Sequence, residues 1–310
     1  MTDISARVRV GTRGSELARR QTDEVVTALR QHWPMLDITV HIFSTTGDQV
    51  TDKPLPQIAG EGVFTSALER ALLEGQIDLA VHSLKDMPIA LTPGTQIGAL
   101  PARAYAADVL ISREGYTLET LPDNAVIGTS SRRRAAQLRH QRPDAQIKDI
   151  RGNVDTRIRK AYDPANGYDA IVLARAGLER LGRLEDASQT LPLDVMLPAP
   201  GQAALAVQCR AEAAWRVLLA PLNHAETAVA VTAERGFLHG LGGGCALPVA
   251  AYATATADEL RLRGRIIAFD GSVQIDVEDT FSTADPTAAG ARLAQQALAK
   301  GGARLLEVLS

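Results

Sequence analysis

Residues 8–34, VRVGTRGSELARRQTDEVVTALRQHWP, decide the fold class, because they join an apolar strand to an amphipathic helix through a short polar turn. The apolar residues from Val8 to Gly11 predict a strand. Ser15 is a favourable residue for a helix N-cap, and Pro34 ends the helical pattern. Between them the apolar residues recur at helical spacing, at Val25, Val26, Leu29 and Trp33. A strand followed directly by such a helix is typical of an α/β sheet.

The same pattern returns later in the chain, where GTSS at 128–131 corresponds to GTRGS at 11–15. We expect strands at 38–43, 78–81, 125–128 and 169–173, and helices at 63–73, 133–140 and 174–181. This alternation predicts two α/β blocks, and the two Gly-Thr turns indicate a weak internal repeat. Helix N-termini preceded by small residues offer free backbone N–H groups to anions, so both turns are candidate anion sites.

The character of the sequence changes after LPAPGQAA, residues 197–204. A helical pattern covers 225–238, and the loop LGGGCALP follows at 241–248. Two strand-like runs then flank Asp270 and Gly271, a favourable hairpin turn, and a final helix is expected over 286–299. The sequence therefore predicts a third part of α+β type.

Length and composition favour a folded chain with several cores. The chain has 310 residues, of which 45% are hydrophobic and 22% charged, as in ordinary globular proteins. The opening MTDISARVRV contains no apolar run, and no stretch is apolar enough to cross a membrane, so we expect a cytoplasmic protein. Two cysteines without a CxxC spacing exclude a disulfide framework and the usual zinc motifs.

Positive charge is concentrated in one window, although the whole chain carries −3. Residues 126–160 hold ten Lys or Arg against three Asp, which makes this window +7. Guanidinium groups pair bidentately with carboxylate or phosphate, so the window suits an anionic ligand. A solvated basic helix face is the alternative. RNA is disfavoured because the window has no aromatic residue on which a base could stack.

Two further motifs offer reactive groups. HSLKDMP, residues 82–88, places Lys85 and Asp86 at the end of an apolar strand, where ligand-facing groups lie in α/β sheets. A surface Lys–Asp turn pair is the alternative. Cys245 lies in a glycine-rich loop and could be a nucleophile or an attachment point, whereas Cys209 in ALAVQC is expected in the core. His239 near Cys245 is weak evidence for a cysteine hydrolase, because sequence spacing does not define such a pair.

The chain resembles the hydroxymethylbilane synthase family, also called porphobilinogen deaminases, in eight segments that occur in the family's order: GTRGSELA, EGVF, VHSLKDMP, GTSSRRR, RGNVDTR, AGLERLG, LPAPGQ and GGGCALP. The resemblance implies a transferase that joins four porphobilinogen molecules head to tail with loss of ammonia and then releases the linear tetrapyrrole with water. It implies two α/β domains similar to type II periplasmic binding proteins, with the active site between them, plus the C-terminal α+β domain.

The resemblance also implies domain boundaries, a cellular location, an oligomeric state and a cofactor. The first domain would comprise 1–103 with 199–219, the second 104–198 and the third 220–310. The protein would be a cytoplasmic monomer that binds neither nucleic acid nor membrane and needs no metal. Its cofactor would be a dipyrromethane group, attached covalently through the sulfur of Cys245, onto which the substrate units are joined.

Site roles follow from the same resemblance. Asp86 would be the catalytic carboxylate. The cofactor would be bound by Cys245, Lys85, Ser83, Thr129, Ser131, Arg133, Arg134, Arg151 and Gly152. The substrate would be bound by Arg13, Ser15, Gln21, Phe64, Arg151, Arg157 and Arg180.

The chain departs from the family's pattern at a few positions. Arg132 stands where the family commonly has Leu, which leaves open which of the three successive arginines point inward. Glu16 and Glu61 replace a common Pro and Lys. A non-catalytic binder of small acids is the alternative function, but it would not account for the Lys85–Asp86 pair or for Cys245.

Overall fold

A computed structural model describes residues 7–44, 65–243 and 248–309 of the chain. The described chain divides into two compact units. Unit 1 runs to Ala104 and includes Ala204–Ala228, and unit 2 comprises Tyr105–Ala203 together with the chain from Val229 onward. The division into three domains expected from the sequence, 1–103 with 199–219, 104–198 and 220–310, remains a prediction.

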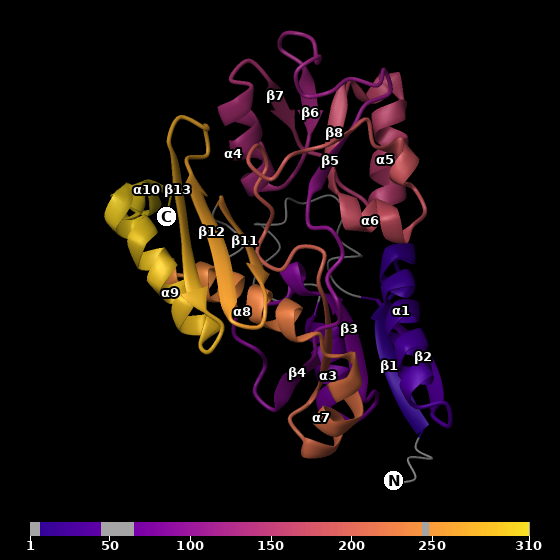
Figure 1. Ribbon diagram of the computed structural model, residues 1–310. Helices are drawn as coiled ribbons and strands as arrows, with labels where there is room; N and C mark the ends of the chain where they lie inside the picture. The colour runs from indigo at the N-terminus through magenta and orange to yellow at the C-terminus, as the bar shows by residue number, and fades with distance from the viewer. Residues whose placement is uncertain (1–6, 45–64, 244–247, 310) are drawn as a thin grey trace. The chain divides into compact units, whose positions relative to one another are not determined.

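Unit 1 is built on a five-stranded mixed sheet in the order β2-β1-β3-β10-β4 (Figure 1). Its strands are β1 (Arg7–Arg13), β2 (Asp37–Phe43), β3 (Leu79–Ser83), β4 (Thr95–Ala99) and β10 (Leu205–Arg210). Its helices are α1 (Glu16–His32), α3 (Ser66–Leu73) and α7 (Ala213–Leu219). The first three strands of the order run parallel, and β10 pairs antiparallel with both β3 and β4.

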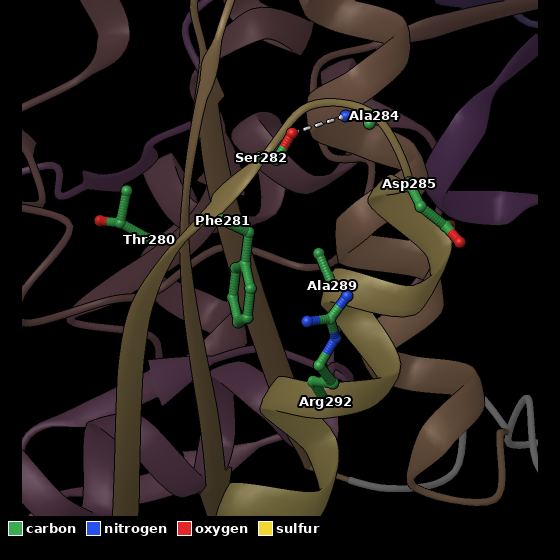
Figure 2. A pocket seen from close by; sticks show the side chains of 7 residues that line it. All are labelled: Thr280, Phe281, Ser282, Ala284, Asp285, Ala289 and Arg292. Atoms are coloured by element: carbon green, nitrogen blue, oxygen red, sulfur yellow. Dashed lines mark hydrogen bonds between the residues drawn. The ribbon is translucent and has the colours of Figure 1, made fainter.

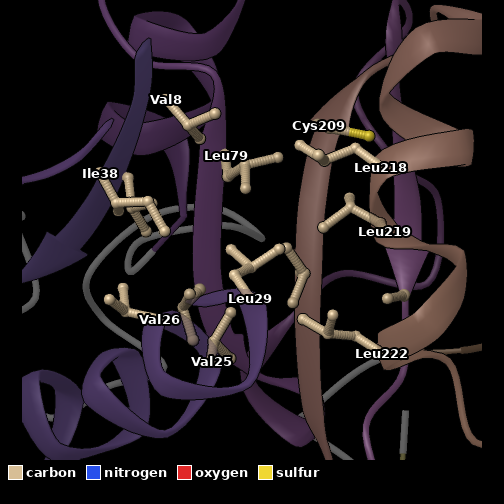
Figure 3. Packing of buried hydrophobic residues seen from close by; sticks show 14 of the residues in the cluster. Val8, Val25, Val26, Leu29, Ile38, Leu79, Cys209, Leu218, Leu219 and Leu222 are labelled. Carbon is tan, nitrogen blue, oxygen red and sulfur yellow. The ribbon is translucent and has the colours of Figure 1, made fainter. Parts of the chain in front are cut away.

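The core of unit 1 confirms the prediction that α1 is an amphipathic helix. Val25, Val26 and Leu29 are buried and belong to one apolar cluster with Val8 of the sheet and Leu219 of α7 (Figure 3). Cys209 is buried in the same cluster, as predicted, and burial raises the pKa of its thiol to about 11. This cysteine is therefore a core residue that stays protonated at neutral pH.

Unit 2 contains a second five-stranded sheet, in the order β7-β6-β8-β5-β9. Its strands are β5 (Asp108–Ile111), β6 (Val126–Gly128), β7 (Gln146–Lys148), β8 (Ala170–Ala174) and β9 (Gln189–Thr190). The helices of this part are α4 (Arg132–Gln141), α5 (Val154–Tyr162) and α6 (Arg175–Arg180). Again three neighbouring strands are parallel, and β5 pairs antiparallel with β8 and β9.

The two sheets have matching topology, which gives the predicted internal repeat a structural basis. In each sheet the strand that carries the glycine of the Gly-Thr pair, β1 with Gly11 and β6 with Gly128, is second in the order. Each is followed by a helix capped by serine, Ser15 in α1 and Ser131 in α4. In each sheet the fourth strand comes from a segment that follows a change of unit, β5 in unit 2 and β10 in unit 1. The predicted α/β fold class is confirmed.

The C-terminal part of unit 2 is α+β, also as predicted. A three-stranded antiparallel sheet comprises β11 (Val249–Ala255), β12 (Glu259–Ile267) and β13 (Gln274–Ser282), and the predicted hairpin joins the last two. The helices are α8 (Ala225–Gly240), α9 (Pro286–Ala297) and α10 (Ala303–Leu309). Gly264 on β12 leaves room for Phe237 of α8, because a Cβ atom there would lie 2.3 Å from the ring.

This α+β part packs directly on α4. Arg139 Nη1 donates to the carbonyl of Phe269 at 2.7 Å, and His140 Nδ1 lies 2.8 Å from the carbonyl oxygen of Gly271. Arg265, buried on β12, donates to Gln137 Oε1 of α4 at 2.8 Å. Side chains of the basic window therefore hold the hairpin against α4.

Within the described residues, no helix is long and apolar enough to cross a membrane.

Candidate active site

The turn after β3 carries three of the predicted site residues, Ser83, Lys85 and Asp86. It is anchored by Leu84, which is buried and donates its backbone N–H to the carbonyl of Ala204 at 3.0 Å. Asp86 is exposed, and among the described residues its carboxylate has no hydrogen bond or ion pair. A fixed turn thus presents a carboxylate that is available to a ligand.

The N-terminal half of α1 supports this turn. Gln21 is buried and its Nε2 donates to Ser83 Oγ at 2.9 Å, so two predicted site residues contact each other. Ser15 caps the helix by accepting a hydrogen bond from the backbone N–H of Ala18 at 3.3 Å. This cap explains Ser15 structurally, and its predicted contact with substrate remains a prediction.

His82, which precedes Ser83, was not among the predicted site residues. It is buried, and burial lowers the pKa of its imidazole to about 4, with the positive charge of Arg13 acting in the same direction. The ring is therefore neutral at pH 7. Because β1 pairs in parallel with β3, with Gly11 opposite Ala80, Arg13 at the end of β1 lies near the end of β3.

In unit 2 the predicted residues gather at one edge of the sheet, because β6, β7 and β8 are parallel and end at the same edge. The loops and helices that follow these strands carry Thr129, Ser131, Arg133, Arg134, Arg151, Gly152, Arg157 and Arg180. Ser130 ties two of the loops together, because its Oγ donates to the carbonyl of Ile150 at 3.0 Å and accepts from its N–H at 3.1 Å. The loops after β6 and β7 are thus held side by side.

Arg133 and Arg134 are buried around Asp108, a residue that sequence reasoning missed. Arg133 Nη1 lies 2.8 Å from one carboxylate oxygen, and Arg134 Nη2 donates to the other at 2.7 Å. Gln202 Nε2 also donates to Asp108, at 3.0 Å. Burial alone would raise the pKa of Asp108, but the two guanidinium charges outweigh burial and hold the pKa well below its usual range.

This arrangement answers which arginines point inward. Arg133 and Arg134 are buried at Asp108, whereas the guanidinium of Arg132 lies over the ring of Phe269, 5.2 Å from its centre. The signal for Asp108 was present in the sequence, since an Asp between Ala107 and VLI must be paired if that run is a buried strand. The predicted contacts of these arginines with the cofactor remain a prediction.

RGNVDTR forms the start of α5, with Asn153 as its N-cap. Gly152 has φ of +118°, and a Cβ atom there would lie 2.7 Å from Thr156 Cγ2, so this position requires glycine. The carbonyl of Gly152 accepts a hydrogen bond from Arg157 Nε at 2.7 Å. Arg151 Nη1 is buried and has no hydrogen-bond partner among the described residues.

Arg180 lies near the segment that returns from unit 2 to unit 1. Its Nη2 donates to the carbonyl of Ala203 at 3.2 Å, and Ala203 has a φ of +70°, which is uncommon for a residue with a side chain. Phe64 and Cys245 lie outside the described residues. Glu61 lies outside them too.

The α+β part of unit 2 contains a pocket whose lining residues are distant in sequence from the predicted site residues. It opens between β13 and α9 and is lined by Thr280, Phe281, Ser282, Ala284, Asp285, Ala289 and Arg292 (Figure 2). None of these seven is a predicted site residue. In the part of the chain that the structure describes, no group of three or more His, Cys, Asp or Glu side chains is placed to hold a metal ion.

The arginine edge of unit 2 fits a ligand with carboxylate groups. Arg151 tests whether such a ligand fits, because one of its guanidinium nitrogens is buried without a hydrogen-bond acceptor. Burying an unpaired donor costs free energy unless a ligand provides the acceptor. A dipyrromethane group bearing carboxylates meets that requirement. In unit 1, considered by itself, the exposed Asp86 carries a negative charge, which suits a cationic or N–H-bearing group.

Comparison with protein families gives two matches that together cover most of the chain. Residues 8–216 match the model described as porphobilinogen deaminase, dipyromethane cofactor binding domain. Residues 228–299 match the porphobilinogen deaminase C-terminal domain.

Curated relatives match over almost their whole length. The chain is similar to porphobilinogen deaminase of Moorella thermoacetica, with 47% identity over 97% of this chain and 96% of the relative. It is also similar to the porphobilinogen deaminase of Brevibacillus brevis, with 45% identity over 97% of each chain.

Two solved structures are similar to part of the chain at low sequence identity. One is CbnR, a LysR family transcriptional regulator, with 10% identity, 71% coverage of each chain and a TM-score of 0.43. Another is a nutrient binding protein from Burkholderia cenocepacia bound to methionine, with 15% identity, 69% and 90% coverage and a TM-score of 0.39.

Proposed function

The chain belongs to the porphobilinogen deaminase family, and on that premise we propose that it joins four porphobilinogen molecules into a linear tetrapyrrole. The protein is a transferase of tetrapyrrole biosynthesis. The match to named porphobilinogen deaminases over nearly the full length of both chains carries this conclusion. The alternative of a non-catalytic acid binder is not favoured.

Asp86 is the proposed catalytic carboxylate. Its exposure on an anchored turn supports this role, because the group can reach a ligand without first breaking an ion pair with a described residue. A negative charge there stabilises the cation that remains when ammonia leaves the aminomethyl group of porphobilinogen. The same carboxylate then accepts the proton that the pyrrole carbon loses when the new carbon–carbon bond forms.

The other site residues bind and orient. Ser83, Lys85, Arg13, Ser15 and Gln21 of unit 1 are proposed ligand contacts, and Gln21 also positions Ser83. In unit 2, Thr129, Ser131, Arg133, Arg134, Arg151, Gly152, Arg157 and Arg180 are proposed contacts for carboxylates. When bound through Cys245, the dipyrromethane group supplies the pyrrole carbon to which the first substrate unit is joined.

The first test is the intact mass of the denatured protein beside a Cys245→Ser variant. The wild type is expected to exceed its chain mass by two porphobilinogen units less two ammonia, and the variant is expected to show the bare chain mass. A Cys209→Ser variant is the matched control, because that thiol is buried in the core and should not change the increment. A wild type that stays at chain mass after incubation with porphobilinogen would contradict the proposal.

Arg151→Leu tests the carboxylate contact. Removing a guanidinium from a site where one of its nitrogens is buried should raise KM by about tenfold or more, or reduce the mass increment. Arg159→Leu on the exposed side of α5 removes the same charge and is the control. Wild-type KM together with a full increment in Arg151→Leu would exclude this role.

The setting of the reaction is also proposed. We propose a cytoplasmic monomer with three domains, 1–103 with 199–219, 104–198 and 220–310. Neither nucleic acid nor membrane is needed as a partner, because the substrate is a small molecule.

A further inference from the structure

We propose that Arg175 is an additional carboxylate-binding residue of the unit 2 site, one that receives an acetate or propionate group of the pyrrole chain. This inference rests on the proposed function, because that function supplies the ligand. Arg175 was not among the residues expected from the sequence, although it lies directly before AGLERLG.

The position of Arg175 in the fold is the first observation. Arg175 follows β8, the central strand of the unit 2 sheet, and its backbone N–H donates to the carbonyl of Ala107 at 3.0 Å. The last residue of β8, Ala174, is paired with Asp108. Arg175 therefore lies at the sheet edge where the loops after β6 and β7 also end, with Ser131 and Arg151.

The second observation is an unmet hydrogen-bonding requirement. Arg175 Nε is buried and has no hydrogen-bond partner, and within the described residues its side chain forms no ion pair. Other arginines of unit 2 are paired with a carboxylate, as Arg134 is with Asp108 and Arg142 with Asp144. Arg151 also has a buried nitrogen, Nη1, without a hydrogen-bond partner. Two guanidinium groups at this edge therefore each have a buried N–H donor that lacks an acceptor.

The third observation is that the guanidinium is already oriented. It lies over the ring of Tyr105, 5.0 Å from the ring centre. Stacking occupies a face of the planar group and leaves its N–H donors, which lie in the plane, free to bind a carboxylate through two hydrogen bonds. The contact fixes the plane of the group and reduces the entropy lost on binding.

The ligand class follows from this geometry. A planar fork with a buried donor favours a planar anion, and each pyrrole unit of the proposed ligand carries two carboxylates. A chain that grows by one unit at a time adds two carboxylates per step. Arg175 gives the site one more guanidinium group, besides that of Arg151, to bind these carboxylates.

The experiment compares Arg175→Gln, Arg175→Lys and the wild type as cofactor-bearing protein. KM for porphobilinogen, kcat, melting temperature and the intact-mass series of chains with added pyrrole units are measured for each. Arg292→Gln is the matched control, since Arg292 also lies over an aromatic ring, that of Phe281, but in the α+β part. The expected result is a KM about tenfold higher in Arg175→Gln, with a smaller rise in Arg175→Lys, which keeps the charge.

The mass series should change as well. Arg175→Gln is expected to carry fewer added units per chain at a given porphobilinogen concentration, while its melting temperature and that of Arg292→Gln stay at the wild-type value. Unchanged KM and mass series in Arg175→Gln would overturn the inference, as would a lower melting temperature with unchanged KM. Absence of ammonia release from the wild type would instead contradict the proposed function.

Discussion

Asp86→Asn is expected to lower the rate of ammonia release from porphobilinogen by about 100-fold or more, because the amide can neither stabilise a cation by charge nor accept its proton. The change removes no contact made by a described residue, since the Asp86 carboxylate is exposed and unpaired there. The fold and the cofactor increment should therefore remain. Ammonia release under saturating substrate is the measurement.

The control for Asp86→Asn is Asp23→Asn, the same chemical change on the exposed face of α1 in the same unit. It should retain the wild-type rate. Near-normal turnover in Asp86→Asn, with the cofactor increment present, would remove Asp86 from the chemical step and leave it at most a binding role.

Asp108→Ala is expected to destabilise unit 2 by about 3–5 kcal/mol, because it leaves two buried guanidinium groups without their counter-charge. Gln202 loses an acceptor at the same time. Thermal unfolding followed by calorimetry and circular dichroism measures the change. The control is Asp37→Ala, which breaks an exposed ion pair with Arg7 and should cost less than about 1 kcal/mol.

The stabilisation by Asp108 should also depend on pH. Its pKa in the folded protein lies below the value of about 3.9 expected when unfolded, so the unfolded chain binds the proton more readily. The stabilisation is complete above that value and is lost as pH falls further toward the folded pKa. The difference in stability between the wild type and Asp108→Ala should thus narrow below about pH 4. A constant difference down to pH 2 would contradict the assigned ion pairs.

The sequence predicted those parts of the fold whose signals are local. The helices α1, α4, α8 and α9 follow from apolar spacing and caps, and the β12–β13 hairpin follows from its Asp270–Gly271 turn. Strands β5 and β10 were not predicted as strands. Each is a short apolar run whose partner lies elsewhere in the chain, as when Leu205 pairs with Ser83, and nothing local indicates that partner.

The site shows the same division. Lys85 and Asp86 could be proposed as site residues because they follow an apolar strand, where polar groups meet ligands. For Asp108 the sequence indicates only that a buried carboxylate would need a partner. The partners themselves, two arginines of α4 for Asp108 and the ring of Tyr105 for Arg175, are brought in by the fold. Residue type alone cannot separate a paired arginine from one that awaits a ligand.

The strand order of the unit 1 sheet has a consequence for synthesis on the ribosome. The buried strand β3 ends at Ser83, but its neighbour β10 begins only at Leu205. At ordinary elongation rates the nascent chain carries β3 with one open edge for on the order of ten seconds before β10 emerges. An open apolar edge invites pairing with other chains, so the sheet of unit 1 is open to wrong pairing during synthesis until β10 emerges.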